Sequence, residues 1–305
     1  MENFFKIQKY SFKEGIYDFS IEDNVTQVVK KFYEDTPFPN YKNTDDKASL
    51  LEIGNKNFLM KNLKNFIGNN KRVLEIGAGT CQFSNYLAIG SNNEIVSFDS
   101  SLESLKLGSE FAKKNNLNNV KFVRGDIFDD IFLEETFDFV ITNGVLHHTG
   151  NAKKAFCKAC LPLKKKGHIF VGLYNRYGRI RSIIRKYLYK ILGKQILFIL
   201  DPVLRKIPKN SSGKIDAWIK DQYLHPIESL HTFDEVLSWF DYNNIDFVSS
   251  IPKCNPYEII EKEPFLRQSK GTSSERIFSQ LIMIFNHFGS EGGLFIFTGK
   301  KNKLI

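Results

Sequence analysis

The chain has 305 residues, of which 42% are hydrophobic and 25% charged, so it can bury a sizeable core as one large domain or two small ones. Its 20 Gly, 9 Pro and 4 Cys are ordinary frequencies and exclude collagen-like, disulfide-scaffold and wholly disordered proteins. Of the formal net charge of +9, all is accounted for by the segment 175–209, which holds ten basic residues and the single acid Asp201.

Residues 1–68 precede the first core strand and are predicted to form an N-terminal helical cap. An aromatic and proline-rich loop, Phe32–Tyr41, lies within this cap. Its aromatic faces could close over a cationic ligand, so Tyr33 and Tyr41 are candidate substrate-binding residues. The alternative is a loop with no role in binding.

From Lys71 onward, short β-rich runs alternate with helical stretches, which is typical of βαβ units and a parallel sheet. The predicted strands are Arg72–Ile76, Glu94–Phe98, Lys121–Val123, Phe137–Thr142, His168–Leu173, Asp246–Ile251 and Leu294–Gly299. The predicted helices between them are Cys81–Ile89, Leu102–Asn115, Ala152–Leu161 and Thr232–Tyr242. The order predicts an α/β fold with a doubly wound, mostly parallel, seven-stranded sheet in a domain covering residues 69–305.

The segment 175–231 interrupts the chain after the fifth core strand and is predicted to be a basic helical insertion that acts as a lid. Its first part has a helical apolar stripe from Ile180 to Leu192, with Arg and Lys on the other face. Three interpretations stay open: the stripe packs on the core, it meets a membrane or a lipid-like acceptor, or the charges track RNA phosphates. No RNA-binding module is recognisable in the chain.

The run Val73–Thr80 leads an apolar strand into Gly77-Ala78-Gly79 and then opens a helix. Glycines allow a sharp turn and a close approach of the backbone to a ligand. A nicotinamide or flavin dinucleotide site requires a third glycine, here at position 82, to admit a pyrophosphate. Position 82 is Gln, which argues against such a site.

Three further features follow in order at the ends of the next strands. Asp99 ends the second strand, where a carboxylate can accept both hydroxyls of a ribose. Asp126 and Ile127 follow the third strand, beside an expected adenine. The segment Asn143-Gly144-Val145-Leu146-His147-His148 closes the fourth strand at the carboxyl edge, where open α/β sheets bind ligands.

Through these four motifs, residues 71–174 resemble the class I S-adenosylmethionine-dependent methyltransferases, especially the branch with a Val-Leu-His-His segment. The resemblance implies S-adenosyl-L-methionine as cofactor and S-adenosyl-L-homocysteine as product. The implied cofactor-binding residues are Glu75, Gly77, Ala78, Gly79, Asp99, Ser100, Asp126, Ile127, Asn143 and Gly144. It also implies that the closing strands 246–251 and 294–299 form the family's antiparallel pair, here with about forty residues between them.

Candidate catalytic bases are His147 and His148 at the strand edge and His225 after the insertion, where a histidine could take a proton from the acceptor. A packing role is the alternative for each. The second cluster, Asp221–Thr232, together with the end of the fifth strand adds candidate substrate-binding residues: Tyr174, Tyr223, Glu228 and His231. The histidine, cysteine and carboxylate spacings match no zinc signature, so no metal is expected.

The sequence thus predicts an enzyme that methylates oxygen or nitrogen of a small or amphipathic metabolite. The first alternative is a tRNA or rRNA methyltransferase that uses the basic patch 176–209, and the second is a non-catalytic regulatory subunit that binds the cofactor. Without a signal peptide or an apolar run of membrane length, we expect a cytoplasmic protein. A peripheral contact of the basic patch with the inner membrane stays open.

Overall fold

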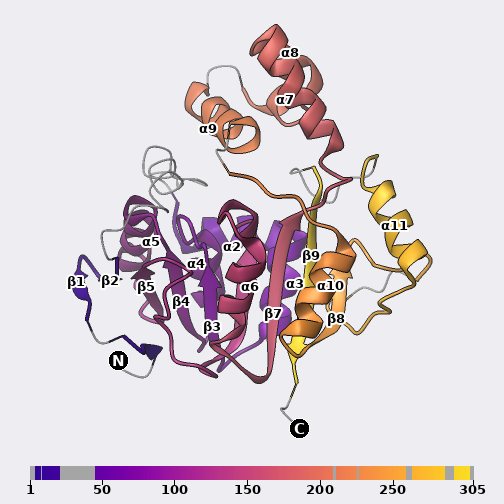
Figure 1. Ribbon diagram of the computed structural model, residues 1–305. Coiled ribbons are helices and arrows are strands. Elements are labelled where there is room, and N and C mark those ends of the chain that lie inside the picture. Colours follow the sequence, from indigo (N-terminus) through magenta and orange to yellow (C-terminus); the bar gives the residue numbers. More distant parts are fainter. Residues whose placement is uncertain are drawn as a thin grey trace.

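The computed structural model describes residues 4–7, 9–20, 45–208, 211–224, 227–258, 263–285 and 292–302. Within these residues one nine-stranded sheet runs in the order β1-β2-β5-β4-β3-β6-β7-β9-β8 (Figure 1). The strands are β1 (Ser11–Lys13), β2 (Ile16–Asp18), β3 (Arg72–Ile76), β4 (Glu94–Asp99), β5 (Val120–Arg124), β6 (Phe137–Asn143), β7 (Leu163–Tyr174), β8 (Ile245–Ile251) and β9 (Leu294–Lys301). Strands β2 to β7 pair in parallel.

Helices cover both faces of the sheet, as the doubly wound prediction requires. The helices are α2 (Lys47–Lys56), α3 (Phe58–Ile67), α4 (Gln82–Ala88), α5 (Leu102–Lys114), α6 (Ala152–Cys160), α7 (Ile180–Leu192), α8 (Gln195–Leu200), α9 (Ser212–Tyr223), α10 (Phe233–Tyr242) and α11 (Ser273–Ile282), with short 3-10 helices η2 (Leu146–His148) and η3 (Leu204–Lys206). One buried cluster joins the sheet to α6 and α10, and a second joins it to α2, α3, α4 and α5. The α/β fold class is confirmed.

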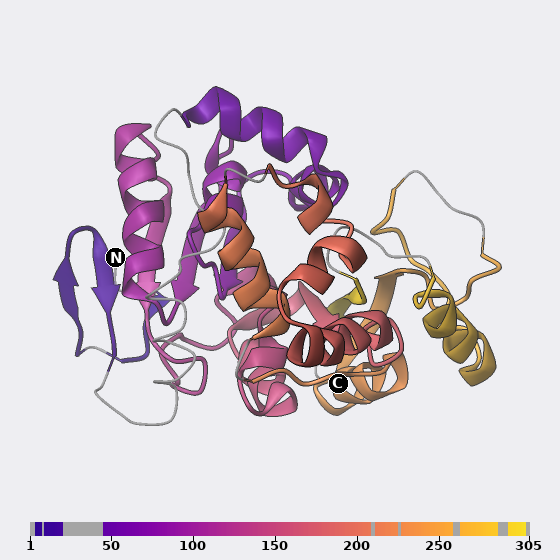
Figure 2. The same cartoon turned by 90° about the horizontal axis from the view of Figure 1, so that it is seen from above.

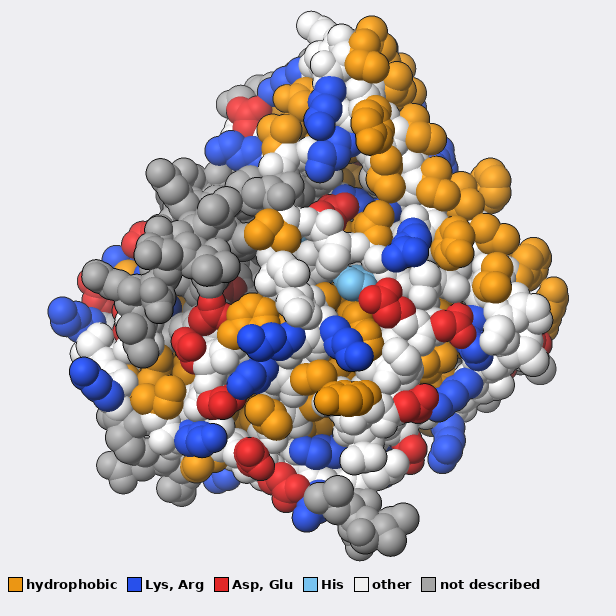
Figure 3. Space-filling view, viewed as in Figure 1, with side chains coloured by type: hydrophobic (Ala, Val, Ile, Leu, Met, Phe, Trp, Pro, Cys, Tyr) orange, Lys and Arg blue, Asp and Glu red, His pale blue; other side chains and the backbone are white. Residues whose placement is uncertain are grey.

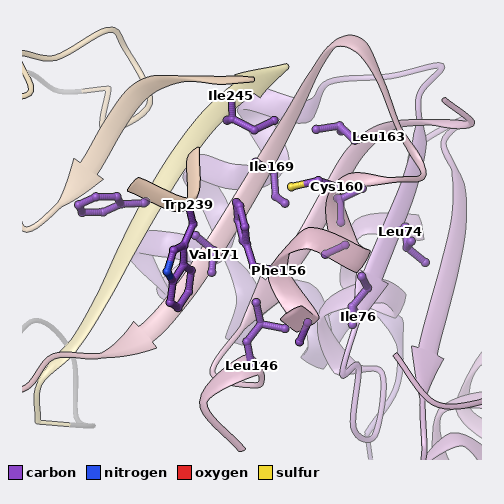
Figure 4. Packing of buried hydrophobic residues seen from close by; sticks show 14 of the residues in the cluster. Leu74, Ile76, Leu146, Phe156, Cys160, Leu163, Ile169, Val171, Trp239 and Ile245 are labelled. Carbon is purple, nitrogen blue, oxygen red and sulfur yellow. The ribbon is translucent and has the colours of Figure 1, made fainter. Parts of the chain in front are cut away.

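The core between α6, α10 and the sheet is rich in aromatic side chains (Figure 4). The ring of Phe156 stacks on the ring of Phe240, with the two centroids 5.4 Å apart. Its centroid lies 5.9 Å from that of Trp239. Leu74, Val171 and other aliphatic residues of the central strands fill the space below these rings. This packing fixes α6 and α10 against the sheet, and so fixes the loops that connect them to the carboxyl edge.

The count of seven strands was too low, because residues 11–18 form a β-hairpin and not part of a helical cap. Its turn has positive φ at both Glu14 (54°) and Gly15 (82°), as a two-residue type I′ turn demands. Strand β2 then pairs in parallel with β5, and Arg124 contacts Asp18 at 3.0 Å. Residues 47–67 are helical as predicted, and the domain division at residue 68 stays a prediction.

The two closing strands pair with each other in antiparallel register, from Ile245 opposite Lys301 to Ile251 opposite Ile296. Strand β9 also pairs antiparallel with β7 and therefore joins the closing pair to the sheet. The long connection between β8 and β9 includes α11. The predicted strand pair is confirmed despite this long connection.

The insertion leaves the sheet after β7 and returns beside the point of departure. The backbone of Asn175 pairs with that of His231, and its buried side-chain oxygen accepts hydrogen bonds from the amides of Tyr177 and Gly178, both at 3.0 Å. Figures 1 and 2 show α7, α8 and α9 standing over the carboxyl edge of the sheet. Leu197, Leu204, Ile215, Trp218, Ile219 and Tyr223 form the insertion's own small core.

Candidate active site

The glycine turn after β3 is held against the end of β4. The amides of Gly77 and Ala78 donate to the carbonyl of Phe98 at 2.7 and 3.1 Å. The φ angles of Gly77 (71°) and Gly79 (51°) are both positive, a region that L side chains rarely occupy. A Cβ at position 77 would also overlap the side chain of Val145, so glycine is required there for conformation and for space.

Asp99, at the carboxyl end of β4, contacts the glycine turn at Gly79. Its carboxylate accepts a hydrogen bond from the Gly79 amide at 2.7 Å and another from the Ser101 amide at 2.8 Å. Desolvation by the surrounding atoms nevertheless raises the pKa of Asp99. The predicted Ser100 lies between these partners and is half-buried.

Glu75, on β3, accepts a hydrogen bond from the buried hydroxyl of Ser84 on α4. Burial is the main cause that raises the pKa of Glu75 to about 7, and the negative charge of Asp99 adds to the shift. Two partly desolvated carboxylates therefore lie within electrostatic reach of each other at one edge of the sheet. Such a pair is costly for the protein alone and suits a cationic ligand.

The remaining predicted cofactor residues lie at the ends of β5 and β6. Asp126 accepts a hydrogen bond from the Phe128 amide at 2.9 Å, and Ile127 packs on the hydrophobic core. Asn143 ends β6 with an exposed side chain, and Gly144 follows with φ of 77°. The structure thus brings all ten predicted cofactor residues to the carboxyl edge of four adjacent parallel strands.

His147 and His148 lie in η2, directly after these residues. The ring of His147 is fully buried, with its centroid 4.2 Å from both the His148 ring and the Tyr174 ring at the end of β7. Nδ1 of His148 lies 2.7 Å from the carbonyl oxygen of Ile227. Because a carbonyl oxygen only accepts, this contact places the proton on Nδ1 and the lone pair of the neutral ring on Nε2.

Arg179, one of the ten basic residues of the segment 175–209, is part of this cluster. Its side chain is buried, 2.8 Å from Glu228 and 2.8 Å from the side-chain oxygen of Gln222. Its guanidinium also lies over the Tyr174 ring, 4.0 Å from the centroid. Arg179 points back toward β7 from the turn that begins α7, so it does not belong to the exposed charges of the insertion.

The other candidate substrate residues fall in different places. Glu228 joins the cluster through Arg179. His231 contacts Ser229 through Nε2 at 2.8 Å and Glu235 through Nδ1 at 3.0 Å, so both ring nitrogens hold the loop. Tyr223 donates to Asp201 at 2.7 Å inside the core of the insertion. Tyr33, Tyr41 and His225 lie outside the described residues.

Sequence reasoning missed Ser84 and Arg179, which hold two charged side chains of the site in place. Ser84 is the third residue of α4 and points inward toward Glu75. Because α4 starts directly after the glycine turn, its first turn could have been searched for such a residue. Arg179 pairs with a residue 49 positions away in the chain, so no local pattern signals it. No cluster of three or more potential metal ligands occurs among the residues that the structure describes.

S-adenosylmethionine fits this site by the chemistry of its donors. The cofactor carries positive charge and ribose hydroxyls, and the site offers two desolvated carboxylates, Glu75 and Asp99, next to a glycine turn. Glu75 and the turn would border the methionine part, and Asp99 the ribose. Asp126 and Ile127 would lie beside the adenine.

Comparison with known proteins agrees with this architecture. Residues 67–192 match a family model described as a methyltransferase domain. An uncharacterized methyltransferase of Bacillus subtilis, YcgJ, is 29% identical over 104 residues, which are 33% of this chain and 39% of that protein. The chain therefore matches well under half of that relative's length.

A second relative covers more of the chain. Demethylmenaquinone methyltransferase of Renibacterium salmoninarum is 26% identical over 177 residues, 57% of this chain and 70% of that protein. The solved structure of PKMT2 from Rickettsia typhi in complex with AdoHcy shares the fold, with a TM-score of 0.54 at 16% identity over 81% of this chain and 54% of that one. The parallel sheet and the glycine turn agree with the match of residues 67–192 to a methyltransferase domain.

Proposed function

We propose that the protein transfers a methyl group from S-adenosylmethionine to an oxygen or nitrogen atom of a small or amphipathic acceptor. The observation that carries the proposal is the pair Glu75 and Asp99, held by Ser84 and by the Gly79 amide at the carboxyl edge. The relative named demethylmenaquinone methyltransferase supports a metabolite as the acceptor. In this reading S-adenosylhomocysteine is the product.

When bound, S-adenosylmethionine supplies a methyl group already activated on a sulfonium sulfur. Glu75, Asp99 and the glycine turn would hold it, and it would offer an electrophilic methyl group to a lone pair of the acceptor. The protein's own tasks are alignment and exclusion of water. Asp99 and the glycine turn hold the donor side, while Tyr174 and η2 border the acceptor side.

We propose His148 as the histidine that takes the acceptor's proton. Its Nδ1 lies 2.7 Å from the Ile227 carbonyl oxygen, and in the neutral ring with its proton on Nδ1 the basic nitrogen is Nε2. His147 is fully buried between His148 and Tyr174, and its carbonyl oxygen accepts from the Ser229 amide at 2.9 Å. We assign His147 to positioning the loop and His148 to holding the proton.

Calorimetric titration with S-adenosylmethionine tests the cofactor site. Asp99→Ala should weaken binding by ~1.5–3 kcal/mol, the loss expected for hydrogen bonds to a charged group. Asp130→Ala, which removes an exposed carboxylate paired with Lys158, is the matched control and should bind as the wild type does. Wild-type affinity in Asp99→Ala would show that the cofactor lies elsewhere.

A label-partition assay tests the acceptor class. The protein and methyl-tritiated S-adenosylmethionine are incubated with a host lysate, and the products are separated into RNA, protein, organic and aqueous small-molecule fractions. Label in the organic or aqueous fraction, absent with Asp99→Ala, is the expected result. Label in nuclease-sensitive RNA would replace the metabolite acceptor by tRNA or rRNA, and binding without any transfer would indicate a regulatory subunit.

A further inference from the structure

Helix α7 turns its apolar stripe away from the protein. Tyr187 is 63% exposed and Ile191 77% exposed, whereas Ser182 on the opposite side of the helix is buried. Apolar side chains on the outside of the insertion form what we call the outer face: Ile180, Ile184, Tyr187, Ile191 and Leu192 of α7 and Ile199 of α8. An amphipathic helix on a globular core ordinarily shows the reverse arrangement, with its apolar side covered.

Basic side chains border the outer face. On a helical projection, Arg181 lies beside the stripe on one flank and Lys190 on the other, and both are exposed. Residues 175–200 contain no acidic residue. The face therefore combines an apolar centre with cationic margins, which is the composition of a helix that lies in a membrane interface.

A second exposed apolar surface adjoins the first. Helix α11 exposes Ile277, Phe278 and Leu281, and Phe285 just beyond it is 80% exposed. The turn that begins α7 meets the end of α11, where a Cβ on Gly178 would lie 3.3 Å from Met283. Figure 3 shows apolar side chains running from the insertion down the margin of the molecule to α11.

We propose that the outer face docks on a bilayer that contains anionic phospholipids. The apolar centre would enter the boundary between headgroups and acyl chains, and the flanking Arg and Lys would contact lipid phosphates. None of the helices in the described part of the chain is long and apolar enough to cross a membrane. The docking that we propose is a contact with one leaflet.

Charge argues for a bilayer over the other occupants. A second copy seated on the same face would bring the exposed Arg181 and Lys190 of both copies together, which is unfavourable at a shared interface. RNA would match the charge but would leave Ile184, Ile191 and Ile199 against a phosphate backbone, where apolar side chains gain nothing. Anionic lipid matches both the charge and the apolar centre.

Docking would also narrow the acceptor class, a step that rests on the proposed function. The insertion stands over the carboxyl edge, so a docked protein holds its acceptor side toward the membrane (Figure 1). Tyr174 and Arg179 join that edge directly to the start of α7. We infer that the acceptor is an amphipathic molecule taken from the lipid phase.

Flotation of the full chain with vesicles tests the docking. Vesicles of phosphatidylcholine with 30 mol% phosphatidylglycerol should carry the protein, and pure phosphatidylcholine should carry at least tenfold less. Ile184→Ser/Ile191→Ser and, separately, Arg181→Gln/Lys190→Gln should each reduce binding at least tenfold. The control Ile53→Ser/Tyr242→Ser, which removes two equally exposed apolar residues (51% and 72%) elsewhere, should float as the wild type does.

Absence of flotation with anionic vesicles would overturn the docking proposal, and so would an equal loss of flotation in the control variant. A dimer that Ile184→Ser/Ile191→Ser dissociates while flotation is unchanged would do the same. Tighter binding to RNA than to anionic vesicles, lost in Arg181→Gln/Lys190→Gln, would also overturn it. Calorimetry with S-adenosylmethionine is run on the same variants. Because these residues lie outside the cofactor site, normal cofactor affinity with failed flotation refutes the docking alone, whereas failed cofactor binding by the wild type refutes the proposed function.

Discussion

Two groups of charged side chains lie at the same edge of the sheet. One consists of two acidic residues, and the other is an ion pair. After β3 and β4, Glu75 and Asp99 are both acidic, and desolvation raises the pKa of each. After β7, the buried Arg179 is paired with Glu228 at 2.8 Å and rests on Tyr174. The acidic pair suits a cationic ligand, as we propose, whereas the balanced pair holds the base of the insertion in place.

The largest expected effect comes from breaking the balanced pair. Arg179→Met should lower the free energy of unfolding by about 3–5 kcal/mol, because it leaves Glu228 partly buried without its cation. Denaturant unfolding measures this. Lys194→Met, which breaks the exposed pair with Asp216 at 2.6 Å, is the control and should cost under about 1 kcal/mol. Equal costs for the two variants would mean that burial does not distinguish the two ion pairs.

The acidic pair should behave in the opposite way, with removal of its charge stabilising the free protein. The pKa of Glu75 is raised from 4.5 to about 7 on folding, so the unfolded state loses this proton first and stability falls as pH rises between these values. One pKa unit corresponds to about 1.4 kcal/mol. The free energy of unfolding of Glu75→Gln should therefore exceed that of the wild type by about 3 kcal/mol at pH 8 and by little near pH 4.5.

Urea unfolding at several pH values between 4.5 and 8 measures this difference for Glu75→Gln. Glu110→Gln, on the exposed side of α5, is the control, and its difference from the wild type should stay constant with pH. A difference for Glu75→Gln that does not grow with pH would show that the carboxylate is already compensated inside the protein, and the contrast between the two clusters would disappear.

The smallest effect is expected inside the insertion. Tyr223→Phe removes the hydrogen bond to Asp201 at 2.7 Å, while the Trp218 indole still donates to the same carboxylate at 2.8 Å. We expect a loss of about 1 kcal/mol in the free energy of unfolding and no change in cofactor affinity. Calorimetry with S-adenosylmethionine checks the cofactor affinity. Weakened binding would indicate that Tyr223 acts in the active site and not only in the insertion's core.

The cofactor side of the site could be predicted from the sequence because its parts are local. Gly77 and Gly79 lie just after β3 and Asp99 ends β4, the apolar runs of both strands are plain in the sequence, and parallel strands end at the same edge. The acceptor side could not be predicted as fully. The Arg179–Glu228 pair spans the whole insertion, and both positions look like ordinary surface charges in the sequence.

Local pattern also explains which strands were found. The seven predicted strands have runs of apolar or β-branched residues, whereas β1 and β2 have three residues each and depend on pairing, β1 with β2 and β2 with β5. The turn Glu14–Gly15 between them is a weak signal, because Glu seldom takes a positive φ. Strands this short depend on their neighbours more than on their own sequence.

By itself, the sequence determined the α/β class, the order of the core strands and the place of the cofactor turn, since each follows from residues adjacent in the chain. It also determined that α7 has one apolar side. That this side points outward and that Arg179 points inward became visible in the folded chain alone. The physical reason is that periodicity gives a helix its two faces, but which face is buried depends on the elements that pack against it, and these come from distant parts of the chain.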